Sequence, residues 1–212
     1  MPLVQAKICG LSTPKTLDAA VSGGASHVGF VFYPRSPRHL SAERATGLAA
    51  RTPERVGRVG VFVDPDDALL ESAVGAGRLD ALQLHKTAPD RAAAIRTRHG
   101  LPLWIAVAVR TRADLESAKA WRSLADRIVY DAKTPEGALP GGMGMRFDWA
   151  LLDGFDHPAP WVLSGGLEPD NITEAVRTTG ARMVDVSSGV ESAPGVKDVD
   201  KITRFLQAVA AL

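Results

Sequence analysis

The sequence has few of the features that mark specialised classes of protein. It contains one cysteine among 212 residues, which excludes an intramolecular disulfide and any metal or iron–sulfur site built from several cysteines. Neither sign of charge is in excess, because 25 Lys and Arg residues stand against 24 Asp and Glu residues. We therefore expect neither a nucleic-acid partner, which a basic field would attract, nor a solvating acidic tail.

Long hydrophobic runs and targeting signals are also missing. The longest apolar run, residues 101–109, contains a proline and is far shorter than the roughly 20 residues of a membrane helix. Residues 1–7 have no basic segment followed by an apolar one, so they do not resemble a signal peptide. A lone thiol is typical of a reducing cytosol, and we expect a cytoplasmic protein that does not associate with membranes.

What the sequence does have is the composition of a globular domain, 45% hydrophobic and 23% charged. A typical domain has about 150 residues, and α/β barrels often exceed 200 as single units. We expect one domain over residues 1–212. Its predicted strands are almost continuously apolar, as in parallel sheets covered by helices. These strands are residues 4–9, 27–32, 58–63, 81–84, 103–109, 127–131, 161–163 and 183–186.

Helices are predicted after most of these strands. Residues that can cap or begin a helix are Thr13-Pro14, Ser41, Asp64-Pro65, Pro169-Asp170 and Asp198, as side-chain oxygens and early prolines favour. Helix ends are predicted at Gly23-Gly24, Gly75 and Gly180. Eight strand–helix units in about 200 residues predict an α/β fold of the (β/α)₈ barrel type. An open, doubly wound sheet is the main alternative.

One connection is unusually long. Residues 132–147 show no periodicity and contain four glycines and two prolines. Loops of that length in compact domains are usually functional or disordered, so this loop is a candidate lid. The helix after it is predicted to be short, at residues 148–152.

Polar and reactive residues follow the predicted strands. In a barrel, the carboxyl ends of the strands form the active site, and the residues there are Cys9, Arg38, Asp64, His85, Arg110, Asp131, Ser164-Gly165-Gly166 and Ser187-Ser188-Gly189. The turns after the last two strands are where such barrels commonly bind phosphate. Gly165 and Gly166 would let backbone N–H groups approach an anion, and Ser187 or Ser188 would add a hydroxyl. Gly142-Met143-Gly144 lacks the third glycine and the preceding strand of a dinucleotide-binding loop.

Several of these stretches together resemble a known family, the N-(5′-phosphoribosyl)anthranilate isomerases of tryptophan biosynthesis. The main ones are Lys7-Ile8-Cys9-Gly10-Leu11, Gly29-Phe30-Val31-Phe32, Ser36-Pro37-Arg38, Leu82-Gln83-Leu84-His85, Asp131-Ala132-Lys133, Gly141-Gly142-Met143-Gly144, Leu163-Ser164-Gly165-Gly166-Leu167, Val184-Asp185-Val186-Ser187-Ser188-Gly189-Val190-Glu191, Pro194-Gly195 and Lys197-Asp198. They span nearly the whole chain in order. The resemblance implies a (β/α)₈ barrel.

The resemblance also implies an Amadori rearrangement of N-(5-phosphoribosyl)anthranilate, an aminoaldose, to the ketose 1-(2-carboxyphenylamino)-1-deoxyribulose 5-phosphate. Asp131 corresponds to the general acid that protonates the furanose ring oxygen, and Cys9 to the general base that removes the C2′ proton. Arg38 is expected to hold the anthranilate carboxylate through a bidentate fork. No cofactor and no metal is implied, and the chain is expected to be a monomer or a homodimer.

The remaining site residues follow from the same comparison. Lys7, His85 and Asp185 are expected to help bind the substrate, and the phosphate is expected at Gly142, Gly144, Gly165, Gly166, Ser187, Ser188 and Gly189. Lys86 stands where the family usually has glycine, and Met143 stands where it usually has a hydroxyl residue.

This chemistry needs unusual pKa values. A carboxylic acid that works at neutral pH needs a raised pKa, from burial or from a nearby negative charge. A thiol base needs a lowered pKa, or one matched to its role within the complex. Lys7 and Cys9 share one side of their strand, and Asp185 lies on the strand that would adjoin it in a closed barrel. We expect Lys7 and Asp185 to form a buried ion pair beneath Cys9, since a lone buried charge costs several kcal/mol.

Two alternatives stay open. The first is an isomerase for a related phosphoribosyl substrate, as in histidine biosynthesis, against which Cys9 argues. The second is a catalytically silent phosphosugar-binding barrel, against which the combination of Cys9, Arg38 and Asp131 argues.

Overall fold

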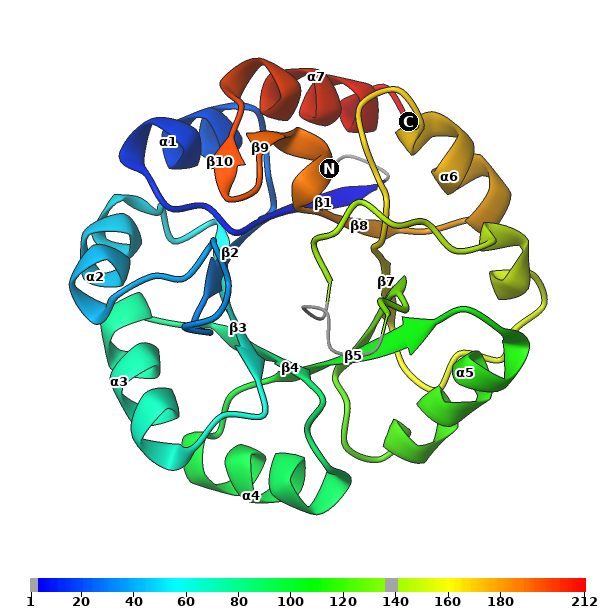
Figure 1. Ribbon diagram of the computed structural model, residues 1–212, viewed down its shortest axis with the longest axis horizontal. Helices are drawn as coiled ribbons and strands as arrows, with labels where there is room; N and C mark the ends of the chain where they lie inside the picture. Colours follow the sequence, from blue (N-terminus) through cyan, green and yellow to red (C-terminus); the bar gives the residue numbers. More distant parts are fainter. Residues whose placement is uncertain (1–3, 136–140) are drawn as a thin grey trace.

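Eight parallel strands close into a barrel in the computed structural model, which describes residues 4–135 and 141–212 (Figure 1). Each strand pairs with the next, and β8 pairs with β1 to complete the ring. The strands are β1 (Gln5–Cys9), β2 (His27–Val31), β3 (Gly57–Val63), β4 (Ala81–His85), β5 (Leu103–Val109), β6 (Arg127–Ala132), β7 (Trp161–Leu163) and β8 (Met183–Val186). The closed barrel is confirmed, and the open sheet is excluded.

The helices surround the barrel on the outside (Figure 1). The described residues include the α-helices α1 (Pro14–Ser22), α2 (Ala42–Arg51), α3 (Asp67–Gly77), α4 (Pro89–His99), α5 (Arg112–Glu116), α6 (Ile172–Thr179) and α7 (Val199–Ala210). Short 3₁₀-helices are η1 (Ser117–Trp121), η2 (Trp149–Leu152) and η3 (Ser188–Val190). The short helix predicted at residues 148–152 is therefore the 3₁₀-helix η2. None of the helices in the described ranges is long and apolar enough to span a membrane.

Three of the predicted helix caps are confirmed. The side chains of Thr13, Ser41 and Asp198 accept hydrogen bonds from backbone N–H groups in the first turns of α1, α2 and α7. Each cap satisfies a donor that the helix itself cannot. Helix ends at Gly23 and Gly180 are confirmed as well.

Other boundaries were wrong by a few residues. The N-cap of α3 is Asp66, whose side chain accepts from Leu69, and not Asp64. That helix runs past Gly75 to Gly77 and ends at Arg78 in the left-handed conformation. The N-cap of α6 is Asn171, one residue after the predicted Pro169-Asp170 start.

The barrel interior changes character along its axis. A fully apolar layer lies toward the amino ends of the strands and comprises Val59, Ala81, Trp104, Val129, Val162 and Met183. Side chains alternate along each strand, so two residues further on the inward positions are Lys7, Gln83, Asp131 and Asp185. Cys9 packs with Val31 and Val61 at the opposite end from the apolar layer. The apolar layer closes one end of the barrel, and the polar residues gather at the other.

A short hairpin was missed from the sequence. It consists of β9 (Glu191–Ala193) and β10 (Val196–Lys197), which pair antiparallel and place Lys197 opposite Glu191. Gly195 has a φ of 81°, the left-handed conformation that a turn with Pro-Gly at its centre requires. Of the predicted lid, residues 136–140 lie outside the described residues.

Candidate active site

Five of the predicted catalytic and substrate-binding residues line one pocket at the carboxyl ends of the strands. They are Cys9, Arg38, His85, Asp131 and Asp185. Cys9 and His85 are the last residues of β1 and β4, Asp131 and Asp185 lie on β6 and β8, and Arg38 lies in the loop after β2. We call this space the central pocket. Elements separated by more than a hundred residues supply its walls, so it exists only in the closed barrel.

Lys7 and Asp185 form the predicted ion pair, with 2.8 Å between Nζ and Oδ2. They are directly opposite each other in the β1–β8 pairing, and Lys7 is completely buried. Burial would lower the pKa of Lys7, but the carboxylate of Asp185 and the thiol of Cys9 together outweigh burial, and the pKa is raised. Asp185 Oδ1 has no hydrogen-bond partner among the described residues although it is buried. One oxygen of this carboxylate is thus free to accept a hydrogen bond from a ligand in the pocket.

Asp131 has the pKa that a general acid at neutral pH requires. Burial raises the pKa of its carboxyl to about 7, and the nearby charge of Asp185 adds to the rise. A hydrogen bond from the backbone N–H of Ala132 to Oδ1, at 2.9 Å, works in the opposite direction. Desolvation and a like charge are the two ordinary causes of a raised carboxyl pKa. Asp131 can therefore hold a proton near pH 7.

Cys9 differs from the simplest expectation for a base. Burial raises the pKa of its thiol, whereas the charges of Lys7 and Lys197 act to lower it. A thiol pKa that is lowered in the free protein is therefore not found. Of the two conditions predicted from the sequence for a thiol base, this leaves a pKa matched to its role within the complex.

His85 is neutral at physiological pH, because burial lowers the pKa of its imidazole to about 4 and the charge of Lys7 acts the same way. Its Nε2 lies 3.1 Å from the side-chain nitrogen of Gln83. With Gln83 as the donor, Nε2 accepts and Nδ1 carries the proton. Gln83 was missed from the sequence, although its position two residues before His85 places both side chains on one face of β4.

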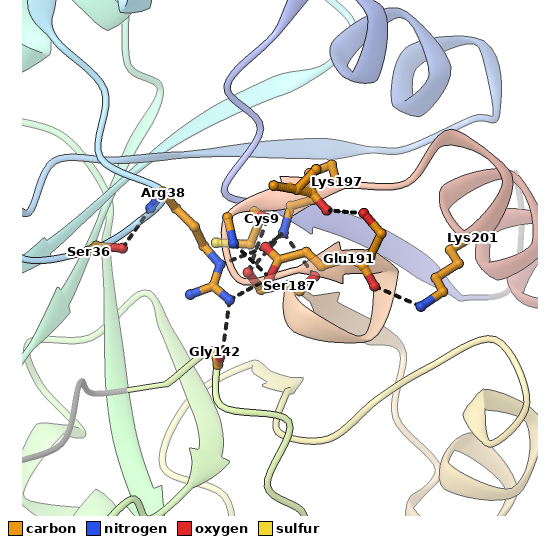
Figure 2. A network of polar contacts seen from close by, with 11 residues as sticks. Cys9, Ser36, Arg38, Gly142, Ser187, Glu191, Lys197 and Lys201 are labelled. Carbon is orange, nitrogen blue, oxygen red and sulfur yellow. Dashed lines mark hydrogen bonds and ion pairs between the residues drawn. The ribbon is translucent and has the colours of Figure 1, made fainter.

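Arg38 belongs to a second buried group of charges, shown in Figure 2. Its Nε and Nη2 donate to the two carboxylate oxygens of Glu191, each at 2.7 Å. Nη2 also donates to the carbonyl of Gly142, at 2.8 Å. Glu191 thus occupies the Nε–Nη2 edge, which the predicted bidentate fork toward the substrate would have used.

Lys197 completes this group, and its Nζ donates to Glu191 Oε1 at 2.6 Å. The same Nζ donates to the backbone oxygen of Ser187 at 2.9 Å and to its hydroxyl at 3.2 Å. Neither Glu191 nor Lys197 was assigned a role from the sequence. The Pro194-Gly195 pair between them was the available signal for a hairpin, because a two-residue turn there pairs Ala193 with Val196. A register shift after Val196 then places Lys197 opposite Glu191.

The predicted phosphate residues surround a second pocket beside the first, which we call the glycine pocket. Gly142, Gly144, Gly165, Gly166, Ser187 and Ser188 line it, together with Asp131 and Asp185. Gly189 does not line it and lies on the neighbouring surface with Arg38 and Glu191.

Two glycines near these pockets cannot be replaced without strain. Gly142 has a φ of 68°, and a Cβ there would lie 2.6 Å from Arg38 Nη1. Gly165 has a φ of 84°, and a Cβ there would lie 2.6 Å from the backbone nitrogen of Ala132. Close approach of backbone to a neighbouring group is a use to which glycine is suited. No cluster of three or more His, Cys, Asp or Glu residues able to hold a metal occurs in residues 4–135 and 141–212.

Comparison with known proteins gives one consistent result. The family model described as "N-(5′phosphoribosyl)anthranilate (PRA) isomerase" matches residues 6–208. A curated relative of that name from Zymomonas mobilis subsp. pomaceae is 55% identical over 211 residues, which cover 99% of each chain.

Solved structures agree with this result. Monomers generated from the dimeric phosphoribosylanthranilate isomerase of Thermotoga maritima share 36% identity, with a TM-score of 0.84 over 99% of this chain and all of that one. A phosphoribosyl anthranilate isomerase in complex with reduced 1-(o-carboxyphenylamino)-1-deoxyribulose 5-phosphate shares 34% identity, with a TM-score of 0.85 over the same proportions.

Proposed function

Since the chain belongs to the N-(5′-phosphoribosyl)anthranilate isomerase family, we propose that it converts N-(5-phosphoribosyl)anthranilate to 1-(2-carboxyphenylamino)-1-deoxyribulose 5-phosphate in tryptophan biosynthesis. The observation that carries this proposal is the carboxyl of Asp131, whose pKa of about 7 lets it donate a proton at neutral pH. It lines the same pocket as the thiol of Cys9. An acid and a base in one pocket are sufficient for an aldose–ketose rearrangement, which moves protons and leaves the overall composition unchanged.

In the first step, Asp131 gives its proton to the furanose ring oxygen. The C1′–O bond breaks, its electron pair stays on the oxygen, and the nitrogen lone pair forms a C=N bond to C1′. The product is an open-chain, positively charged Schiff base. Burial of Asp131 favours this step, because its carboxyl is poorly solvated as an anion and is therefore available in the protonated form.

In the second step, Cys9 takes the proton from C2′. The electrons of that C–H bond form a C1′–C2′ double bond and neutralise the nitrogen, giving an enolamine that tautomerises to the ketose. Burial keeps the thiol protonated in the free protein, since it raises the pKa. The thiol therefore first gives its proton to the carboxylate of Asp131, which the first step left ionised in the same pocket, and the resulting thiolate takes the C2′ proton. The positive charge of the Schiff base favours the thiolate, because opposite charges nearby stabilise the ionised form. Lys7 and Lys197 act in the same direction.

The two anionic groups of the substrate have separate sites in this proposal. The phosphate binds in the glycine pocket, where Gly165, Gly166 and Ser188 offer backbone N–H groups and a hydroxyl. The anthranilate carboxylate binds Arg38 at Nη1, the guanidinium nitrogen without a hydrogen bond to any described residue. A sugar hydroxyl donates to the free Oδ1 of Asp185, while His85 contacts the sugar as a neutral imidazole.

Loss of the fluorescence of phosphoribosylanthranilate measures the reaction directly. We expect turnover by the wild type and a fall in kcat of about 10²–10⁴-fold for Cys9→Ala and for Asp131→Asn, the range typical of a lost general acid or base. Near-wild-type rates in both variants would contradict the proposed roles. An absence of turnover by the wild type would favour a phosphosugar-binding barrel or a related phosphoribosyl substrate.

We also propose that residues 1–212 act as one cytoplasmic domain, as a monomer or a homodimer. The Thermotoga maritima relative is described as dimeric. Sedimentation equilibrium at micromolar concentration distinguishes the two states of this chain, whose monomer mass is 22.4 kDa.

A further inference from the structure

The second buried group of charges contains more than the reaction requires. Arg38, Glu191 and Lys197 are each at least nine-tenths buried, yet Glu191 has no role in the proposed function. Burial of a carboxylate is costly even when the carboxylate is paired, so a buried carboxylate outside the reaction needs another explanation. The arrangement of donors around Glu191 indicates what that is.

We propose that Glu191 is a positioning residue. It binds one edge of the Arg38 guanidinium and thereby leaves Nη1 as the one nitrogen that receives the substrate carboxylate. The inference rests on the proposed function, because it assumes that Arg38 binds this carboxylate. Lys197 holds Glu191 in place from the other side.

Each carboxylate oxygen of Glu191 accepts two hydrogen bonds. Oε1 accepts from Arg38 Nε at 2.7 Å and from Lys197 Nζ at 2.6 Å. Oε2 accepts from Arg38 Nη2 at 2.7 Å and from the backbone N–H of Gly195 at 3.2 Å. Burial opposes ionisation of Glu191, but the bonds from Arg38 and Lys197 outweigh it and hold its pKa below the usual range. The carboxylate is therefore ionised and held by donors from three residues, Arg38, Gly195 and Lys197.

This arrangement determines which part of Arg38 remains available. A guanidinium has three nitrogens, of which Nε and Nη2 are bound to Glu191 and Nη2 also to Gly142. In Figure 2, the remaining nitrogen of Arg38 carries no dashed line. A fork of two parallel bonds to a second carboxylate needs two adjacent free nitrogens. Arg38 therefore binds an incoming carboxylate through one nitrogen.

The charges of the group lead to the same conclusion. Arg38 and Lys197 are positive and Glu191 is negative, so these three side chains together have a net charge of +1. A single substrate carboxylate neutralises it. Without Glu191, two cations would be buried together. Burial already lowers the pKa of Lys197, and removing Glu191 would lower it further, so Lys197 would lose its proton more readily.

The group also reaches the other parts of the site. Lys197 binds the carbonyl and hydroxyl of Ser187, and the Ser187 hydroxyl donates to the carbonyl of Cys9 at 3.3 Å. Figure 2 shows these contacts as one continuous network from Arg38 to Cys9. The same network that orients Arg38 thus fixes the end of β8 against the end of β1.

Calorimetric binding of two matched ligands tests the proposal. The first is reduced 1-(o-carboxyphenylamino)-1-deoxyribulose 5-phosphate, and the second is the same molecule without the carboxylate. For Glu191→Gln we expect the Kd of the first ligand to rise about 10- to 100-fold, the size expected for a weakened hydrogen bond to a charged group. The Kd of the second should change less than about twofold. In kinetics, KM should rise with little change in kcat.

Arg38→Met gives the complementary measurement. It should weaken the carboxylated ligand alone, and adding Glu191→Gln to it should cause no further loss, because Glu191 acts through Arg38. If Arg38→Met leaves that affinity unchanged, the carboxylate site of the proposed function is wrong. If Arg38→Met behaves as expected while Glu191→Gln weakens both ligands equally or neither, the positioning role is wrong.

Two further variants serve as controls for the loss of charge and for folding. Glu116→Gln removes an exposed carboxylate whose partners are Lys119 and Arg112, and it should leave both Kd values unchanged. Glu191→Asp retains the charge on a shorter side chain and should recover part of the lost affinity. Failure of both Glu191 variants to fold would overturn the proposal, because it would show that the carboxylate maintains the barrel rather than the orientation of Arg38.

Discussion

The two buried groups of charges at the mouth of the barrel differ in both construction and net charge. Lys7 and Asp185 come from adjacent strands at the same register position, and their charges cancel. Arg38, Glu191 and Lys197 come from a loop and a hairpin, and their net charge is +1. The neutral pair lies beneath the reacting groups, whereas the positive group lies beside them.

This difference indicates what each group does. The neutral pair has no net charge left for a ligand, but its carboxylate helps raise the pKa of Asp131. Its ammonium opposes the rise that burial causes in the pKa of Cys9, and its carboxylate adds to that rise. It therefore adjusts the acid and the base. The positive group has one charge left over and contributes to anion binding. Variants that remove charges singly should separate these two roles.

The largest expected effect is on the neutral pair. Lys7→Met leaves the carboxylate of Asp185 buried without its partner, and breaking a buried pair in this way typically costs about 3–5 kcal/mol. The free energy of unfolding from urea titration at pH 7 measures the loss. The double variant Lys7→Met, Asp185→Leu removes both charges and should recover most of it. Equal stability of the single and double variants would contradict the view that the unpaired charge is the cause.

The second effect is on the pH profile. Asp131 acts as an acid only when protonated, and its pKa is raised to about 7, so kcat/KM should fall as pH rises through about 7. Asp185→Asn removes a nearby negative charge and should lower the pKa of Asp131, moving this alkaline limb to lower pH by on the order of one unit. Glu191→Gln should leave the limb in place, because Glu191 is not among the groups that shift Asp131. An equal shift of the alkaline limb in both variants would contradict the view that Asp185, and not Glu191, sets the pKa of Asp131.

The smallest effect lies outside both groups. Lys86 is exposed and follows His85 with a φ of 52°, a left-handed conformation that costs a side-chain-bearing residue roughly 1 kcal/mol. Lys86→Gly should raise the free energy of unfolding by about 0.5–1 kcal/mol. It should change kcat/KM less than about twofold at physiological salt, since exposed charges are screened.

The matched control is Arg78→Gly, which relieves the same kind of strain at a φ of 44° at the end of α3. It should stabilise the protein equally. A large kinetic change in Lys86→Gly alone would show that this exposed charge acts at the site.

How well the sequence predicted the site follows the regularity of each segment. Strands of parallel barrels obey a two-residue alternation and a fixed neighbour order, so the pairing of Lys7 with Asp185 could be predicted from these rules. The partners of Arg38 could not, because Glu191 lies in a hairpin that follows no such repeat. The charge state of Cys9 also depended on three-dimensional burial, which its position at a strand end does not reveal.

The start of α3 was predicted wrongly because the sequence offers two capping residues close together. Asp64 and Asp66 are both good capping residues, and only the path of the chain after β3 decides between them. Asp64 takes a left-handed conformation, with a φ of 41°, and the side chain two residues later caps α3.

Closure of the barrel through β1 and β8 has a consequence for the order in which the chain becomes functional. Lys7 and its partner Asp185 are 178 positions apart, and Arg38 and Glu191 are 153 apart. A ribosome therefore completes seven strands before either charged group can form, and the first strand carries an ammonium that must stay hydrated until then. The last strand–helix unit of the barrel both closes the ring and supplies the counter-charges, so the barrel closes and the two charged groups form at the same stage of synthesis.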